Sequence, residues 1–180
     1  PETAKSPEQR AEGAGSMDVR LYAFTCGFLT IPHSFLLEKV DGWITVPIPS
    51  YLVVHPKGKV LFDSGLNLKT QTEPEGYMGS VGMRFTTFHF HPGEEVSARL
   101  ADLSIDADEI THLVNSHLHY DHSGGNAQIS KADVLVQRRE WDHAKALPDD
   151  DLACRKEDFD TGQRVRKVDG EHDLFGDDAV

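Results

Sequence analysis

The sequence predicts a mixed α/β domain, and its hydrophobic pattern supports this fold class in three ways. After Met17, short β-prone segments are separated by turn residues. Val96, Leu100 and Leu103 then recur at helical spacing and predict an amphipathic helix over residues 94–103. Beyond this helix, three apolar segments of strand length and one short helical segment follow.

The other elements follow from local patterns. Strands are expected at residues 19–25, 43–46, 51–55, 59–63, 110–115, 132–137 and 164–168, and a short helix at 138–146. Pro56-Lys57-Gly58 is a turn signal that joins the third and fourth of these strands into a hairpin. Residues 26–32 are predicted to form a loop. Residues 67–93 have no clear period and contain several glycines and prolines, so they predict a second, longer loop.

Residues 1–16 are rich in Ala, Glu, Gly, Ser and Pro and carry no hydrophobic period. They predict a disordered or expression-derived leader that is separate from the fold. Residues 17–180 are expected to belong to a single domain. Ala179-Val180 resembles the first step of a strand, so we expect the chain to hold only the N-terminal part of that domain.

Composition excludes several classes of partner. The 180 residues contain no apolar run of the roughly 20 residues that span a bilayer, so no membrane partner is expected. The net charge of −12 repels phosphate backbones, which argues against nucleic acid. Cys26 and Cys154 are far apart and form no disulfide scaffold, which predicts a reduced, cytoplasmic protein. The sequence leaves open whether the protein forms an oligomer.

The segment NSHLHYDHSGGN at residues 115–126 carries the chemistry. Four potential metal ligands fall within six positions, directly after a predicted strand. Imidazole nitrogen with carboxylate oxygen is a ligand set that zinc favours. His117 and His119 point the same way on an extended chain and can hold one ion, while Asp121 and His122 can reach a second. Metal storage or sensing also fits this cluster, but its place at a strand end favours a catalytic site.

These residues resemble the H-x-H-x-D-H signature of the metallo-β-lactamase superfamily, and VLFDSG resembles the strand of that family that ends in Asp-Ser/Thr-Gly. The resemblance covers roughly residues 17–180 and implies the N-terminal portion of an αββα sandwich. It implies two divalent ions, with Zn²⁺ expected, the first bound by His117 and His119 and the second by Asp121 and His122. The remaining ligands of the family have no match here, and we expect them beyond Val180.

Within the superfamily, the chain most resembles the N-acyl-homoserine lactonases, through SHLHYDH, the GGN that follows, VQRREW and the long aromatic loop before the motif. The resemblance implies opening of a lactone ring by a metal-bridging hydroxide, and so degradation of quorum-sensing signals. Asp121 would then be both a ligand and the proton carrier. A thioester hydrolase of the glyoxalase II type and a non-catalytic metal-binding fragment are the alternatives.

Two further sets of residues are candidates for supporting roles. Asp63 either orients a metal-bound histidine or caps a turn, and the sequence does not separate these two interpretations. Six apolar residues could line a pocket for an acyl chain, with packing in the core or at a subunit contact as the alternative: Phe28, Leu29, Met78, Met83, Phe85 and Phe88.

Overall fold

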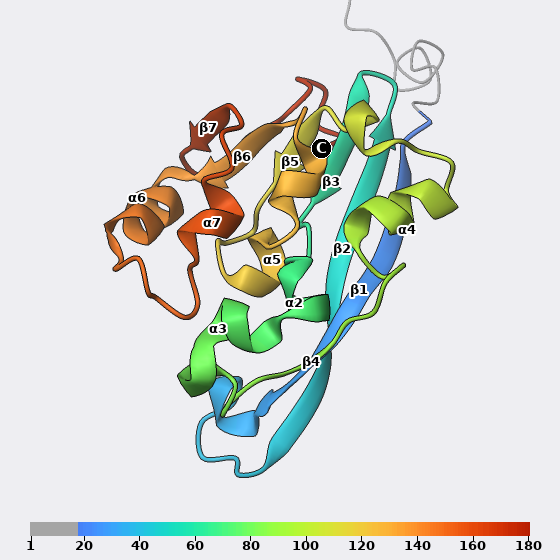
Figure 1. Cartoon of the computed structure of the whole chain (residues 1–180). Coiled ribbons are helices and arrows are strands. Elements are labelled where there is room, and N and C mark those ends of the chain that lie inside the picture. The colour runs from blue at the N-terminus through green and yellow to red at the C-terminus, as the bar shows by residue number, and fades with distance from the viewer. Residues whose placement is uncertain (1–17) are drawn as a thin grey trace, which may run out of the picture.

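The computed structural model describes residues 18–180, so the leader expected at residues 1–16 lies outside the described residues. Within that range, seven strands form one sheet in the order β4-β1-β2-β3-β5-β6-β7 (Figure 1). The strands are β1 (Arg20–Pro32), β2 (Trp43–His55), β3 (Gly58–Phe62), β4 (Thr87–His89), β5 (His112–Val114), β6 (Asp133–Gln137) and β7 (Val165–Val168). β4, β1, β2 and β3 pair antiparallel, whereas β3, β5, β6 and β7 are parallel. The predicted α/β class is confirmed.

β1 is longer than the sequence predicts. The strand was expected to end at Thr25 before a loop at 26–32, but it continues to Pro32. Its register against β2 shifts between Thr25 and Phe28, and Gly27 has a φ of 88°. This irregularity is a β-bulge, which breaks the alternation of side chains without ending the strand. The predicted loop is therefore wrong.

β2 is a single strand where the sequence predicts two short ones, at residues 43–46 and 51–55. Pro47 and Pro49 interrupt the β-prone pattern between them, yet both residues pair with β1. β3 pairs with β2 only from Tyr51 onward, so the two prolines lie where β2 has a neighbour on one side only. Proline is tolerated there because no hydrogen bond from its nitrogen is needed toward the free edge.

The remaining predicted elements are confirmed to within two residues at each end. They are the hairpin turn between β2 and β3, the strands β5, β6 and β7, and two helices. The described helices are α2 (Lys69–Thr72), α3 (Pro74–Gly82), α4 (Val96–Asp102), α5 (Tyr120–Ser123), α6 (Arg138–Ala146) and α7 (Lys156–Phe159). Short 3-10 turns are η1 (His33–Phe35), η2 (Ala107–Glu109) and η3 (Asn126–Ile129).

The long loop predicted at residues 67–93 is wrong, because this segment forms α2, α3 and β4. Pro74 begins α3, a position that proline favours because the first amide of a helix has no partner inside the helix. Gly79 then interrupts α3 with a φ of 73° and a ψ of 162°. The helical turns on either side of this kink are too short to produce a visible period in the sequence.

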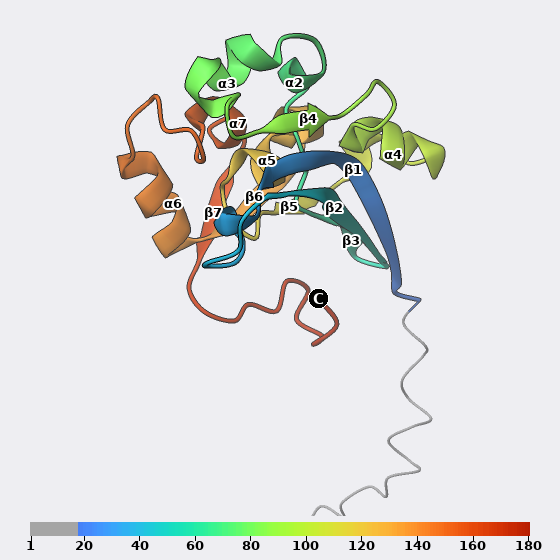
Figure 2. The same cartoon turned by 90° about the horizontal axis from the view of Figure 1, so that it is seen from below.

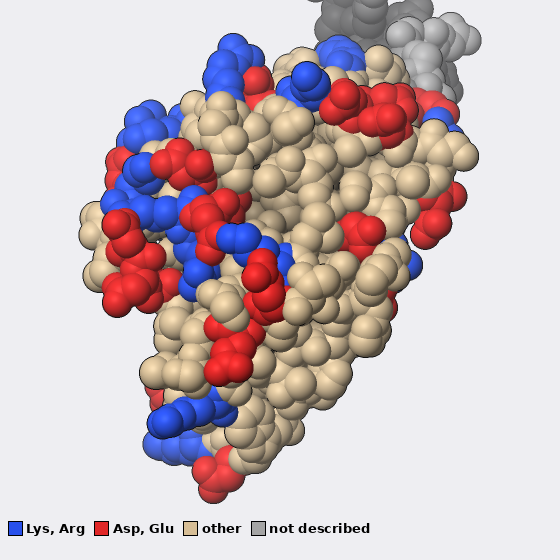
Figure 3. Space-filling model, in the orientation of Figure 1, with Lys and Arg blue, Asp and Glu red and all other residues tan. Residues whose placement is uncertain are grey.

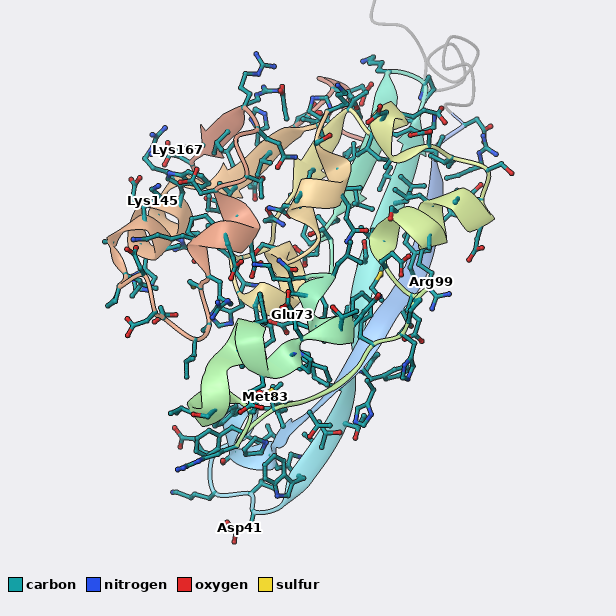
Figure 4. The ribbon with its side chains drawn as sticks, in the orientation of Figure 1. Asp41, Glu73, Met83, Arg99, Lys145 and Lys167 are labelled. Atoms are coloured by element: carbon teal, nitrogen blue, oxygen red, sulfur yellow. The ribbon has the colours of Figure 1, made fainter. Side chains whose placement is uncertain are left out.

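The helices lie on one side of the sheet, as Figure 2 shows. α4 is attached to β1 by Arg99, labelled in Figure 4, whose Nε donates a hydrogen bond of 3.0 Å to the carbonyl of Thr25 beside the bulge. Beneath α4, a buried core joins the helix to four strands: Val96, Leu100, Leu52, Leu61, Leu113 and Val134. The described residues thus form one α layer and one β layer. The core between these layers fixes the positions of the strands and hence of their carboxyl ends.

The opposite face of the sheet carries the C-terminal segment, which runs along it in Figure 2. The ring of Phe175 stacks on His55, with the ring centroids 4.4 Å apart. Beside this segment, apolar side chains of β3, β5 and β6 line a hollow of about 340 Å³. Helices therefore cover one face of the sheet, whereas the C-terminal segment lies on the other.

On the outer surface, charges of both signs gather over α6 and α7 (Figure 3). Exposed ion pairs account for part of this pattern: Lys145–Asp160, Lys156–Asp149 and Lys167–Asp142. Pairs of this kind contribute little to stability because water screens them. None of the described helices is both long enough and apolar enough to span a bilayer.

Candidate metal centre

Asp63 and the histidine motif lie at one edge of the sheet because β3 and β5 are parallel neighbours. Phe62 and Val114, the last residues of these strands, are paired in the register. The carboxyl ends of parallel strands meet at the same edge, which brings Asp63 next to Ser116 across 53 positions of sequence. The amide of Asp63 donates to the carbonyl of Val114 at 2.8 Å and fixes the start of this loop.

The carboxylate of Asp63 is buried, with 5% of the residue exposed, and accepts three hydrogen bonds. Oδ1 accepts from the amide of Ser116, while Oδ2 accepts from the Ser116 hydroxyl and from Nδ1 of His122, each at 2.8 Å. The bond to Nδ1 fixes the orientation of the imidazole ring. Asp63 therefore touches a predicted metal ligand directly, as the first of its two interpretations requires.

The four predicted ligands come together at this edge. The ring of His117 lies with its centroid 4.5 Å from that of His119 and 4.0 Å from that of His122. Nε2 of His122 is 3.4 Å from a carboxylate oxygen of Asp121. Asp121 and His122 belong to α5, whereas His117 and His119 precede that helix. The short helix thus turns the last two ligands toward the first two.

Two glycines allow α5 to lie against the chain that follows β3. A Cβ atom on Gly124 would stand 2.4 Å from the amide nitrogen of Asn67, and one on Gly125 would stand 2.2 Å from the carbonyl oxygen of Ser64. Both distances are far below contact distance, and both obstacles are backbone atoms. The Gly-Gly pair after the motif is therefore a packing requirement of the candidate site.

A buried polar network holds the same two segments together. The hydroxyl of Ser64 donates to Oδ1 of Asn126 at 2.8 Å, and Nδ2 of Asn126 donates to Oδ1 of Asn115 at 2.9 Å. The amide of Ser64 also donates to the carbonyl of His122 at 2.8 Å. All three polar side chains are almost fully buried, so each bond is made in a low-dielectric surrounding where it is strong.

The sequence analysis did not identify two residues that hold the motif from the other side. A carboxylate oxygen of Glu140 accepts a hydrogen bond of 2.9 Å from the amide of Leu118. The carbonyl of Ala153 accepts one of 2.8 Å from the amide of Tyr120. Glu140 could have been found, because it follows β6, whose carboxyl end lies at the same edge. Ala153 gave no signal in the sequence.

Burial and charge set the protonation of the cluster. Burial lowers the pKa of His122, but its hydrogen bonds with Asp121 and Asp63 outweigh this effect and raise the pKa to about 10. Burial, together with the neighbouring His122 and His119, lowers the pKa of His117. Burial raises the pKa of Asp121, but the hydrogen bond with His122 outweighs it and the net shift is downward. His117 is thus held neutral and Asp121 ionised, the states that metal ligands adopt, whereas His122 carries a proton at neutral pH that a bound metal would have to displace.

The donor set fits divalent metal in its chemistry, since three imidazoles and one carboxylate are neighbours at one edge of the sheet. Within residues 18–180, however, no group of three or more His, Cys, Asp or Glu side chains is arranged so that it could hold an ion. A division of the four ligands into two pairs, one for each of two ions, is compatible with this finding. Each ion would then have two of these four residues as ligands and would need further ligands from elsewhere.

An apolar pocket of about 460 Å³ opens beside the cluster. Its lining comes from β1, η1, α3, α5 and the segment before α7: Leu29, Ile31, Phe35, Leu36, Met78, Gly82, Phe85, Thr86, His119, Tyr120, Asp121, Leu152 and Ala153. His119 and Asp121 therefore face the pocket, while most of its wall is hydrocarbon. The sequence analysis did not anticipate the walls from η1 and from Leu152.

Of the six residues predicted to line an acyl pocket, Leu29, Met78 and Phe85 are in this lining. Phe88 lies behind it, with its ring edge-on to Tyr120 at a centroid distance of 6.0 Å. Phe28 is 39% exposed on β1, and Met83, labelled in Figure 4, follows the last residue of α3. These last two are adjacent in sequence to lining residues but are not part of the lining.

Residues 43–179, which include the histidine motif and the whole parallel part of the sheet, match the Metallo-beta-lactamase superfamily. The chain belongs to this superfamily. The family resemblance predicted from residues 115–126 is thereby confirmed.

Curated relatives within the metallo-beta-lactamase superfamily share a name. N-acyl homoserine lactonase AttM of Azorhizobium caulinodans is 32% identical over 172 residues, which are 91% of this chain and 65% of the relative. N-acyl homoserine lactonase AiiA of Bacillus thuringiensis subsp. kurstaki is 25% identical over 134 residues, which are 69% of this chain and 51% of the relative. The chain thus spans between about half and two thirds of the length of these relatives.

Solved structures of superfamily members share the fold. An N-acyl homoserine lactone hydrolase with N-hexanoyl-L-homoserine bound at its catalytic metal center matches with a TM-score of 0.77 at 21% identity, over 87% of this chain and 62% of that chain. AidC, a dizinc quorum-quenching lactonase, matches with a TM-score of 0.59 at 15% identity, over 88% of this chain and 60% of that chain. The α layer and β layer described above are therefore part of a metallo-beta-lactamase fold.

Proposed function

We propose that the protein is a metal-dependent hydrolase that opens the ring of N-acyl-homoserine lactones and so degrades quorum-sensing signals. One observation carries the proposal: His119 and Asp121 line the same apolar pocket of about 460 Å³. A substrate that joins a hydrolysable polar head to a hydrocarbon chain matches this combination. The curated relatives AttM and AiiA, both named N-acyl homoserine lactonases, support the same substrate class.

In this proposal His117 and His119 hold the first of two divalent ions, and Asp121 and His122 hold the second. Zn²⁺ is the proposed metal, because imidazole and carboxylate are its usual nitrogen and oxygen ligands. Bound divalent ions lower the pKa of water from 15.7 toward about 7 and polarise a carbonyl oxygen. Asp63 would act through His122, whose ring it orients by the bond to Nδ1.

Asp121 is the proposed catalytic residue of the chain itself. Its carboxylate faces the pocket, and the net lowering of its pKa keeps it in the ionised form. Opening of a lactone transfers a proton from the attacking water to the alkoxide that leaves. Asp121 would receive that proton on a carboxylate oxygen and deliver it to the alkoxide.

The acyl chain would occupy the apolar part of the pocket. Leu29 and Phe85 are proposed to contact it directly, and Phe88 to support the wall through Tyr120. Phe28 and Met83 would act from the periphery, beside Leu29 and Gly82. Burial of each CH₂ group is worth about 0.8 kcal/mol, so the pocket would favour longer chains until its length is filled.

Location and domain organisation complete the proposal. We propose that residues 17–180 are the N-terminal part of one such hydrolase domain and that it works in the cytoplasm. Cys26 and Cys154 are free and buried, and burial raises the pKa of their thiols to about 12 and about 11. Such thiols are inert as nucleophiles and suit a reducing compartment. The partner would be a small lactone, with no role for nucleic acid or membrane.

The test combines metal quantification with a pH-stat assay of ring opening, on the full-length protein and a series of lactones. We expect two metal ions per chain and ring opening of acyl-homoserine lactones. His117→Ala should lose bound metal and abolish ring opening. His143→Ala is the matched control, because His143 is exposed on α6, and this variant should retain both properties.

Each contrary outcome has a distinct meaning. A protein that binds two metals and hydrolyses thioesters but no lactone would be a glyoxalase II-type enzyme. One that binds metal and hydrolyses neither substrate would be a metal-binding protein without this activity. Equal effects of the two histidine substitutions would overturn the assignment of the ligands.

A further inference from the structure

A second buried carboxylate, Asp158 on α7, lies outside the candidate metal centre. It is 1% exposed and accepts two hydrogen bonds from different parts of the chain. The hydroxyl of Tyr77 on α3 donates to Oδ2 at 2.5 Å, and Nδ2 of Asn67 donates to Oδ1 at 2.7 Å. Asp158 thereby joins α7 to α3 and to the segment after β3. None of the roles proposed above uses this residue.

The two sides joined by Asp158 both contribute to the wall of the apolar pocket. Tyr77 is followed directly by Met78, which lines the pocket from α3. Leu152 and Ala153 line it from the segment before α7, and the carbonyl of Ala153 is bonded to the amide of Tyr120. The bond between Tyr77 and Asp158 is therefore a cross-link between α3 and α7, two elements whose chain segments contribute to the pocket wall.

α3 has few other means of holding its position. Among the described residues, Tyr77 is the only residue of α3 whose side chain makes a hydrogen bond to another element. The helix is broken at Gly79, so the turn that carries Gly82 is connected to Tyr77 through a kink of positive φ. Arg155 adds to the same attachment, because its guanidinium lies over the Tyr77 ring, 4.3 Å from the centroid.

We propose that Tyr77, Asn67 and Asp158 form a tether that sets the width of the apolar pocket, and that Asp158 is a positioning residue for the length of the acyl chain. This inference rests on the proposed lactonase function. A short acyl chain would depend little on the α3 wall, whereas a long chain would lie against Met78. Loosening the tether should therefore raise KM for long chains selectively and leave kcat largely unchanged, since Asp121 is not touched.

The primary variant is Tyr77→Phe in the full-length, metal-loaded protein. It removes only the hydroxyl and retains the ring beneath Arg155, so the fold should survive. A hydrogen bond to a charged group is worth enough to change an equilibrium about tenfold, so kcat/KM for a twelve-carbon acyl chain should fall about five- to tenfold relative to a four-carbon chain. Asp158→Asn, which replaces the charged acceptor by an amide, should shift the preference in the same direction.

Tyr22→Phe is the matched control. Tyr22 is a partly buried tyrosine of β1 that packs on the core beneath α4, away from the pocket, and its loss of a hydroxyl should leave chain-length preference unchanged. A fall by the same factor at every chain length in Tyr77→Phe would indicate a general loss of stability and would overturn the proposal. So would an unchanged preference in both tether variants.

Hydrogen–deuterium exchange separates the tether from the proposed function. In the wild type, the backbone amides of residues 77 and 83 donate to the carbonyls of Glu73 and Gly79. In the Tyr77→Phe variant these two amides should exchange at least several-fold faster. This readout does not depend on any substrate. If the wild type opens no lactone but exchange accelerates, the proposed function fails while the tether stands. If exchange is unchanged, the tether itself is refuted.

Discussion

Asp63 illustrates how much a single residue near the site depends on the fold. It has a φ of 60°, a conformation that Asp and Asn tolerate better than most residues, and its carboxylate reaches His122 and Ser116. The sequence offered two roles for it, orientation of a ligand or capping of a turn. Only the parallel pairing of β3 and β5 brings it to His122, and sequence spacing alone does not reveal that pairing.

Replacement of Asp63 by Asn should weaken metal binding about 10- to 100-fold without abolishing it. Asn keeps the positive φ, but it has one acceptor oxygen where Asp has two. It therefore cannot accept both from the Ser116 amide, which bonds to Oδ1, and from Nδ1 of His122, which bonds to Oδ2. The loss should be smaller than that in His117→Ala. Competition with a chromophoric zinc chelator measures the affinity.

The control for this substitution is Asp178→Asn. Asp178 has a similar φ of 58° but is exposed in the C-terminal segment, so its replacement should not change the affinity. Equal affinities of Asp63→Asn and the wild type would leave Asp63 with a turn-forming role only.

The four candidate ligands could be selected from the sequence because they belong to one short motif of metal-binding residue types, and the structure brings them together at one edge of the sheet. The supporting contacts were less predictable. Glu140 and Ala153 bond to the backbone of the motif from segments far along the chain. The position of Glu140 after β6 was the only signal for it, and Ala153 gave no signal. Pocket residues divide in the same way, since Leu29 and Phe85 were anticipated and Leu152 was not.

At the scale of elements, the bounds of a helix or strand could be predicted where one hydrophobic period continues through the whole element. The helix α6 and the buried strand β6 are such cases. Prediction failed where a local irregularity broke the period without ending the element: the bulge at Gly27 in β1, Pro47 and Pro49 in β2, and Gly79 in α3. Whether the strand continues through a bulge or a proline depends on its neighbours in the sheet, because either is tolerated only where no ladder hydrogen bond is needed.

The contact between α5 and the segment after β3 gives a prediction at this scale. In Gly125→Ala the new Cβ would lie 2.2 Å from the carbonyl oxygen of Ser64, a backbone atom that cannot swing away. We expect a loss of about 2 kcal/mol or more in the free energy of unfolding, as for other overpacked sites, together with weaker metal binding. Urea unfolding of the full-length protein at fixed metal concentration measures the loss.

Gly76→Ala provides the comparison for that experiment. A Cβ on Gly76 would meet nothing closer than 3.7 Å, and the residue is helical in α3, so alanine should be neutral or stabilising by up to about 1 kcal/mol. Similar losses in the two variants would contradict the close packing inferred for Gly125.

For the molecule as a whole, Asp158 links three segments of the chain. Protonation of Asp158 should therefore change the free energy of unfolding. Burial raises the pKa of Asp158 from 3.8 to about 6, and Glu157 acts in the same direction, against the opposing effects of Tyr77, Asn67 and Arg155. The folded protein thus holds this proton more tightly than the unfolded chain does. The contribution of Asp158 to stability is therefore complete below about pH 4 and is lost as the pH rises to about 6.

The amide side chain of the Asp158→Asn variant cannot ionise, so the unfolding free energy of this variant should lack the pH dependence that Asp158 contributes. The difference in unfolding free energy between wild type and variant should change by up to about 3 kcal/mol between pH 4 and pH 6.5, in favour of the variant at the higher pH. Urea unfolding of both proteins at half-unit pH intervals measures this difference, and titration of the other carboxylates cancels in it. Parallel curves for the two proteins would show that Asp158 keeps an ordinary pKa in the folded state.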